Sequence, residues 1–305
     1  MQAIVVDELG GPEVLRLREV PAPAPGPGEI LVDISAAGVN FMDTGTRRAG
    51  PPGVSVPFIP GVEAAGTVRA VGTGVSELRT GDRVAWPYAY GSYAGQIVLP
   101  AASVMMQGLT AHGFATEAYP VRPGDVALVH AAAGGVGRLL TQLVKLRGGT
   151  VIGLVSRGDK AGVARSAGAD HVVVSSGDQF TGEVMRLSGG GVHVVFDGGG
   201  ETTFRASMAV LRRHGTLLYY GPLIGQVPTV SLRDLPGSIK ISYPVFRDHI
   251  PTRDALLEHS AELFSLICNG QLHVNIAQRY QLASAAQAHR DLESRATSGK
   301  LLLLP

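Results

Sequence analysis

One glycine-rich segment, residues 125–137, constrains the fold more than any other part of the sequence. It reads Asp-Val-Ala-Leu-Val-His-Ala-Ala-Ala-Gly-Gly-Val-Gly. The apolar, β-branched run 126–129 is typical of a buried strand. After the glycines, leucines and valines recur at helical spacing as far as Gly148. The order of strand, glycine turn and helix predicts an α/β domain in which backbone N–H groups and a helix N-terminus can bind a phosphate.

The segment departs from the dinucleotide-binding pattern G-x-G-x-x-G at its first position, which is Ala132. Gly134 and Gly137 occupy the second and third positions, with Gly135 and Val136 between them. A bare residue at the second position lets a pyrophosphate approach the backbone, and one at the third lets the helix pack on the strand. The alternative is an ordinary glycine-rich turn, because the chain has 41 glycines.

The end of the next expected strand, residues 150–155, indicates which nucleotide binds. NAD-binding folds place an Asp or Glu there, on the ribose 2′-OH. This chain has Ser156, Arg157 and Lys160 instead. Guanidinium and ammonium groups attract a 2′-phosphate that a carboxylate would repel, so the sequence favours NADPH over NADH. The alternative is that these cations are solvated charges at the start of a helix, where Asp159 would serve as an N-terminal acid.

Composition limits the remaining possibilities. The 305 residues are 45% hydrophobic and 17% charged, which predicts a globular chain of one large or two medium domains. A net charge of +1 gives no electrostatic case for nucleic acid. Neither a membrane span nor an N-terminal signal is visible, so the cytoplasm is the expected location. The single cysteine, Cys268, excludes an intrachain disulfide and a Cys-rich zinc site, and its apolar helical surroundings predict a core position.

Two regions differ in their pattern of secondary structure. Short strands separated by Gly and Pro predict a compact, barrel-like region over residues 1–100. Residues 125–246 alternate strands and helices, which predicts a parallel sheet with helices on both faces. The expected strands there are 125–132, 150–155, 171–175, 192–197, 215–220 and 239–245, and the expected helices include 159–168, 202–213 and 253–270. From residue 280 a helix and then a strand over 300–304 complete the chain.

Five motifs follow one another through nearly the whole chain. They are Gly38-Val-Asn-Phe-Met-Asp43, Pro60-Gly-Val-Glu63, Gln107-Gly-Leu-Thr-Ala-His112, Ala131-Ala-Ala-Gly-Gly-Val-Gly137 and Leu292-Glu-Ser-Arg-Ala-Thr-Ser-Gly299. Together they resemble the quinone oxidoreductase (zeta-crystallin-like) branch of the zinc-independent medium-chain dehydrogenase/reductases. The resemblance implies a GroES-like, β-rich catalytic domain (1–107 and 272–305), a Rossmann domain (108–271) and NADPH in the cleft between them. It also implies a homodimer formed by edge pairing of the strand over 239–246, where apolar residues alternate.

A comparison with zinc alcohol dehydrogenases of the same superfamily bears on the chemistry. Those enzymes carry Cys and His ligands where this chain has Asn40 and Val62, and neither residue replaces such a ligand. Without a metal to polarise an alkoxide, the sequence favours hydride transfer to an electrophilic small-molecule acceptor, a quinone or an enone. A Tyr that is frequent two residues after the Asp of the first motif is Gly45 here, which predicts a wider site.

The resemblance implies roles for individual residues. Asn40 is expected beside the nicotinamide ribose and the acceptor, where its amide can donate to a developing oxyanion; the alternative is a turn asparagine. The other implied cofactor contacts are Thr110 (carboxamide), Tyr220 and Gly221 (over the cofactor), Lys300 (near the phosphates), Ser175 (adenosine phosphate) and Lys160 (2′-phosphate). Glu63 and most of the nine histidines are interpreted as structural.

The sequence leaves the acceptor open. Relatives carry additional residues between Val104 and Met105, so the acceptor side of the site is not predictable there. The first hypothesis is an NADPH-dependent quinone reductase. The alternatives are an enone or enoyl-thioester reductase, for which Arg47-Arg48 is the candidate basic patch, and an NADPH-binding redox sensor with little turnover.

Overall fold

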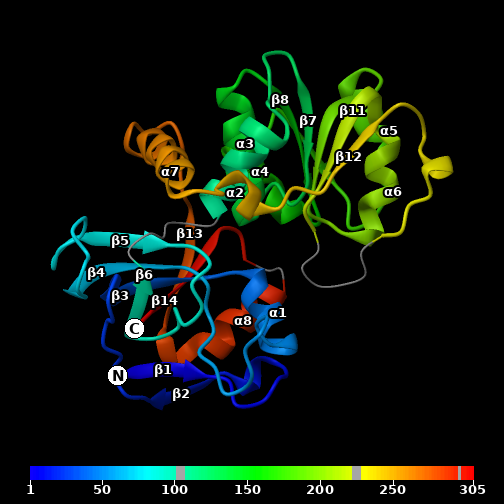
Figure 1. Ribbon diagram of the computed structural model, residues 1–305. Helices are drawn as coiled ribbons and strands as arrows, with labels where there is room; N and C mark the ends of the chain where they lie inside the picture. Colours follow the sequence, from blue (N-terminus) through cyan, green and yellow to red (C-terminus); the bar gives the residue numbers. More distant parts are fainter. Residues whose placement is uncertain (101–106, 222–227, 295–296) are drawn as a thin grey trace. The chain divides into compact units, whose positions relative to one another are not determined.

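The computed structural model describes residues 1–100, 107–221, 228–294 and 297–305 (Figure 1). The chain divides into two compact units, one formed by Met1–Met106 with Asn275–Pro305 and the other by Gln107–Val274. The Val104–Met105 junction and two residues of the motif over 292–299 lie outside the described residues.

The first unit is built on a mainly antiparallel sheet. Its strands run in the order β13 (Ile276–Gln281), β14 (Lys300–Leu304), β3 (Glu29–Val39), β4 (Ala64–Val71) and β5 (Arg83–Trp86), and β6 (Gln96–Pro100) also pairs with β3. A hairpin of β1 (Gln2–Val5) and β2 (Arg16–Glu19) and the helices α1 (Phe41–Ala49) and α8 (Ala285–Glu293) complete it. One hydrophobic core joins residues from both chain ends, including Val39, Trp86 and Leu301. The C-terminal strand therefore completes the β-rich unit that the N-terminal part begins.

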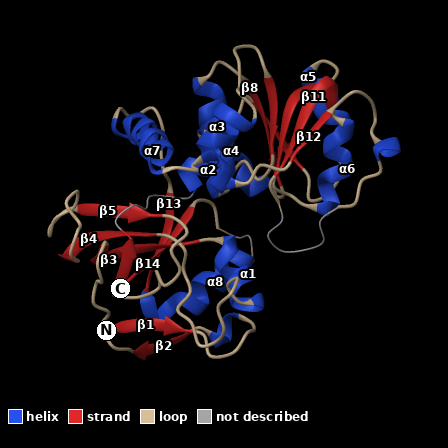
Figure 2. Cartoon of the chain, viewed as in Figure 1, coloured by secondary structure: helices blue, strands red, loops and turns tan. Residues whose placement is uncertain are grey.

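The second unit is a Rossmann-type sheet of parallel strands (Figure 2). The order is β12 (Lys240–Ser242), β11 (Leu211–Tyr219), β10 (Val192–Asp197), β7 (Val126–Val129), β8 (Thr150–Val155) and β9 (His171–Val174). The chain reverses direction across the sheet between β7 and β10, which is the switch point where such sheets bind ligands. α3 (Gly135–Leu146) and α4 (Ala161–Ser166) lie on one face, and α5 (Thr181–Ser188) and α6 (Glu201–Ala209) on the other.

The other elements within the described ranges are α2 (Gln107–Gly113), α7 (Arg253–Cys268) and six short helices. The short ones are η1 (Pro12–Val14), the π-helix η2 (Phe114–Ala118), η3 (Gly158–Lys160), η4 (Leu232–Asp234), η5 (Phe246–His249) and η6 (Leu282–Ser284). No helix in the described part of the chain is long and apolar enough to cross a membrane. The cytoplasmic location stays a prediction.

The structure corrects several expectations from the sequence. The helix expected over 202–213 ends at Ala209, because Leu211 already pairs with Val192 of β10. The strand expected over 239–245 is only Lys240–Ser242, since Pro244 has no N–H for a ladder. The segment 159–168 is split between η3 and α4.

Cys268 is exposed and not part of the core. α7 buries Leu256, Ser260 and Leu263, which repeat at helical spacing along one face. The cysteine is the last residue of the helix and does not continue that series, so the apolar character of its neighbours was misleading.

Candidate functional site

The glycine turn joins β7 to the N-terminus of α3. Gly134 is the N-cap of this helix in extended conformation, and Gly137 lies in its first turn. A Cβ on Gly137 would overlap the carbonyl oxygen of Ala131 and come within 2.9 Å of that of His130. Only glycine therefore allows the helix to follow the strand so closely. The first N–H groups of an α-helix have no acceptor within the helix, so those of Gly135 and Val136 are suited to an anion.

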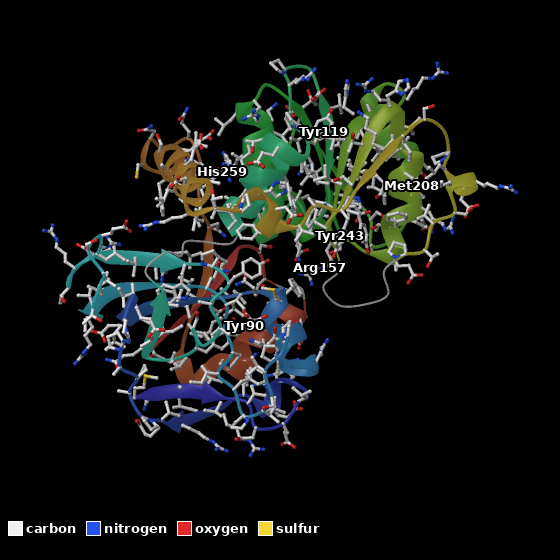
Figure 3. The ribbon with its side chains drawn as sticks, viewed as in Figure 1. Tyr90, Tyr119, Arg157, Met208, Tyr243 and His259 are labelled. Carbon is white, nitrogen blue, oxygen red and sulfur yellow. The ribbon has the colours of Figure 1, made fainter. Side chains whose placement is uncertain are left out.

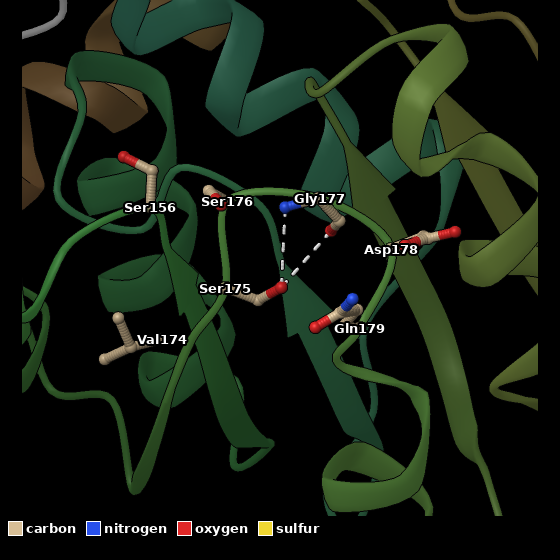
Figure 4. Close-up of a pocket in the computed structure, with 7 residues that line it drawn as sticks. All are labelled: Ser156, Val174, Ser175, Ser176, Gly177, Asp178 and Gln179. Carbon is tan, nitrogen blue, oxygen red and sulfur yellow. Dashed lines mark hydrogen bonds between the residues drawn. The ribbon is translucent and has the colours of Figure 1, made fainter.

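A polar cavity of about 410 Å³ lies at the carboxyl ends of β8 and β9 (Figure 4). Its wall is formed by Ser156, Val174, Ser175, Ser176, Gly177, Asp178 and Gln179. The Ser175 hydroxyl donates to the Gly177 carbonyl over 3.4 Å and accepts from its N–H over 3.5 Å, which gives the cavity its tight turn. Ser156 and Ser175, two of the predicted cofactor residues, thus come together from different strands at the ligand-binding edge of the sheet.

Arg157, which is labelled in Figure 3, directly follows Ser156 after the end of β8. Its Nε and Nη2 donate to the two carboxylate oxygens of Asp159 over 3.1 and 2.7 Å. This bidentate pair raises the pKa of Arg157 and lowers that of Asp159. Asp159 is therefore a partner of the guanidinium and not only a helix-terminal acid. Lys160 is the last residue of η3.

Tyr220 and Gly221 lie just beyond β11, next to the end of β10. The Tyr220 ring packs on Phe114 with ring centroids 5.0 Å apart, and a Cβ on Gly221 would come within 2.7 Å of the Gly198 backbone. Thr110 lies on α2, about half-buried. The structure places these three residues in the Rossmann-type unit, as it does the glycine turn and the cavity.

Asn40 and Lys300 are neighbours in the other unit. β14 runs antiparallel to β3 with Leu301 opposite Val39, so the register sets Lys300 beside Asn40. The Lys300 ammonium donates to Asn40 Oδ1 over 2.9 Å and forms an ion pair with Glu63. Asn40 is also the N-cap of α1, and its backbone N–H donates to Asp43 Oδ2 over 2.8 Å.

A chain of buried polar groups ends on the same Asp43 carboxylate. Arg47 Nη1 lies 3.0 Å from His289 Nδ1, His289 Nε2 lies 3.1 Å from the Tyr93 hydroxyl, and that hydroxyl donates to Asp43 Oδ2 over 3.0 Å. Because a guanidinium can only donate, Nδ1 must accept and the neutral ring carries its proton on Nε2. Every hydrogen bond in this series of polar groups is therefore donated in the direction of Asp43.

Burial sets the protonation states of Asp43 and His289 in this series of polar groups. Desolvation raises the pKa of Asp43 to about 7, although the bond from Asn40 and the charge of Lys300 oppose it. Asp43 Oδ1 has no hydrogen-bond partner in the described parts of the chain. Burial, together with the charges of Arg47 and Arg48, lowers the pKa of His289 to about 3, so its ring is neutral near pH 7.

Comparison with curated proteins decides the family. The chain is 39% identical to a quinone oxidoreductase of Salmonella typhimurium, an alignment that covers 97% of each protein. It is 35% identical to a 2-haloacrylate reductase of a Burkholderia species, over 100% of this chain and 99% of that protein. This chain belongs to the quinone oxidoreductase family.

Domain and structure comparisons agree with the quinone oxidoreductase assignment. An alcohol dehydrogenase GroES-like domain matches residues 26–129, and a zinc-binding dehydrogenase domain matches residues 167–303. The structure of Escherichia coli quinone oxidoreductase complexed with NADPH is similar over 100% of both chains, with a TM-score of 0.95 and 37% identity. The fold class and family predicted from the sequence are therefore confirmed.

Sequence reasoning missed part of what surrounds Asn40. The spacing of Asn40 and Asp43 is that of a capping box and was a usable signal. Nothing in the sequence linked Tyr93 and His289 to them, because these residues come from distant segments. In the described part of the chain, no group of three or more His, Cys, Asp or Glu residues is placed to hold a metal ion.

Proposed function

We propose that this chain is an NADPH-dependent quinone oxidoreductase that transfers hydride without a metal. One observation carries the cofactor assignment: the glycine turn, the cavity at Ser156 and Ser175, and Arg157 all follow strands at the ligand-binding edge of one parallel sheet. Membership of the quinone oxidoreductase family supports the acceptor class.

The residues of the Rossmann-type unit fit NADPH. We assign the N–H groups of Gly135, Val136 and Gly137 to the pyrophosphate, because the first N–H groups of α3 have no acceptor within the helix. The N–H of Gly134 already donates to the Ala131 carbonyl over 2.7 Å, so we assign to Gly134 the bare Cα that lets the pyrophosphate approach the backbone. The assignments for the 2′-phosphate side are Ser156, Arg157, Lys160 and Ser175, and those for the nicotinamide side are Thr110, Tyr220 and Gly221. Bound NADPH supplies the hydride.

Asn40 is our candidate catalytic residue. When a quinone gains a hydride, one carbonyl oxygen becomes an oxyanion that then takes a proton from water. An amide N–H of Asn40 can donate to that oxyanion, and this type of contact is worth about 10²–10³ in rate in other enzymes. Asn40 and Val62 stand where zinc enzymes of the superfamily have ligands, which supports chemistry without zinc.

The test is an assay of NADPH oxidation with 1,4-benzoquinone, a naphthoquinone, a linear enone, crotonyl-CoA and 2-chloroacrylate, each repeated with NADH. We expect turnover with the quinones and a preference for NADPH. Turnover with the enone, the thioester or the haloacrylate but with neither quinone would show that the substrate class is that acceptor and not quinones. NADPH binding without any turnover would support the redox sensor.

A pair of variants serves as the control for the cofactor assignment. Arg157→Ala should lower kcat/KM for NADPH by about tenfold and leave that for NADH unchanged, since it removes a charge-assisted bond to phosphate. Asp159→Asn should act in the opposite direction, because it releases the guanidinium from its bidentate partner. Equal effects on both cofactors would contradict the assignment.

We also propose that the chain forms a homodimer through β12. This strand is the edge of the Rossmann-type sheet, and Ile241 on it is 41% exposed. Tyr243 and Val245, in the segment that follows the strand, are 63% and 43% exposed. Exposed apolar edges of this kind favour pairing with another strand. Light scattering should return twice the 31.7 kDa of the chain, and Ile241→Lys should return a single chain. A wild-type value of one chain mass would contradict the dimer.

A further inference from the structure

We propose that Lys300 is a positioning residue that orients the side-chain amide of Asn40 for the reduction. In this orientation the amide oxygen of Asn40 faces the Lys300 ammonium, and the NH₂ group of Asn40 faces the acceptor. The inference rests on the proposed function and deepens it. The family resemblance implied only a position near the cofactor phosphates for Lys300.

The register of three strands brings the participants together. β3 lies between β14 and β4, with Leu301 opposite Val39 and Ala64 opposite Ala37. Lys300 and Glu63 are each one residue away from these pairs, and Asn40 directly follows β3. Three residues from distant segments therefore meet at one end of the sheet.

The identity of the donor fixes the orientation of the amide. An ammonium group donates hydrogen bonds and cannot accept one, so the atom of Asn40 that faces Lys300 Nζ at 2.9 Å must be the carbonyl oxygen. The Nδ2 group then points away from Lys300 and donates to the Gly38 carbonyl over 3.4 Å. A positive charge on the oxygen side also polarises the amide, which makes its N–H groups stronger donors.

The surrounding residues hold Lys300 in place. Its side chain and that of Glu63 are each 11% exposed and form an ion pair, and Lys300 Nζ also donates to the Val39 carbonyl over 3.4 Å. Gly38 leaves the room for this pair, since a Cβ there would overlap Glu63 Oε1 and come within 2.6 Å of Lys300 Cε. The backbone of Asn40 is fixed independently by Asp43.

The two roles of Lys300 predict different kinetics. A phosphate contact stabilises bound NADPH, so its loss raises KM for NADPH with kcat little changed. A residue that orients Asn40 acts on the oxyanion, so its loss lowers kcat and leaves KM for NADPH unchanged.

The experiment measures kcat and KM of Lys300→Met with a quinone and NADPH. We expect kcat to fall about tenfold or more, because small errors in the position of a catalytic group are costly. Lys145→Met is the matched control. Lys145 lies on α3, and its ammonium pairs with Asp170 at 2.8 Å, so the substitution also breaks a lysine–carboxylate ion pair. The kcat of this variant should not change. A raised KM with unchanged kcat would overturn the proposal in favour of the phosphate contact.

Two further variants separate positioning from effects on the fold. Glu63→Gln combined with Lys300→Met also removes the negative charge that has lost its lysine partner. The double variant should stay slow if Asn40 is misoriented. In an Asn40→Ala background, Lys300→Met should cost nothing further, because the two residues act as one unit. Additive losses would overturn the positioning role, whereas absence of quinone turnover in the unchanged chain would overturn the proposed function itself.

Discussion

Replacing Asp43 with asparagine should change the pH dependence of stability. The free energy of unfolding of Asp43→Asn, minus that of the unchanged chain, should rise by about 1.4 kcal/mol per pH unit. The window extends from the ordinary pKa of 3.8 to the buried value of about 7. In this window the folded chain keeps a proton on Asp43 that the unfolded chain releases. Asp43 therefore contributes stability that is complete below pH 3.8 and is lost as the pH rises to about 7.

His289 contributes in the opposite direction. Its pKa is lowered from 6.5 to about 3, so the unfolded chain binds a proton in this window that the folded chain does not. The stability that it contributes is present above pH 6.5 and is lost as the pH falls toward 3. Where the two windows overlap, the contributions of Asp43 and His289 oppose each other.

Chemical denaturation of three variants over about pH 4.5 to 6.5 tests both slopes. The free energy of unfolding of each variant, minus that of the unchanged chain, should rise with pH for Asp43→Asn and fall with pH for His289→Gln. It should be nearly flat for the double variant. Curves of both single variants parallel to that of the unchanged chain would show that neither group has a shifted pKa.

Placing a methyl group on Gly137 should abolish tight NADPH binding and lower the free energy of unfolding by about 1–3 kcal/mol. The added Cβ of Gly137→Ala would overlap the Ala131 carbonyl oxygen and come within 2.8 Å of the Ala131 carbonyl carbon. These are backbone atoms of the turn, so α3 must move away from β7 to admit the methyl. Cofactor fluorescence titration and thermal unfolding measure the two effects.

Gly182→Ala is the matched control for this prediction. Gly182 lies in the first turn of α5, and a Cβ there would meet nothing within 4 Å. The same substitution should stabilise the chain by about 0.5–1 kcal/mol and leave NADPH binding unchanged, because alanine restricts the unfolded chain. If Gly137→Ala behaves like Gly182→Ala, the close approach at the turn is not needed for the cofactor.

The sequence determined the local elements and the family. The period of the apolar residues and the glycines at 134–137 defined strand, turn and helix, because these signals depend on neighbouring residues and on backbone geometry. Local patterns failed where long-range pairing prevailed: Leu211 joined β11 by pairing with Val192, and apolar neighbours did not bury Cys268.

The groups around Asn40 are brought together by long-range contacts that no local pattern contains. Strand register brings Lys300 to its side chain, and burial joins Tyr93 and His289 to its N-cap partner Asp43. These contacts join residues that are far apart in the sequence, so no local pattern predicts them. The raised pKa of Asp43 has the same origin, because desolvation depends on everything packed around the carboxyl and not on its neighbours in sequence.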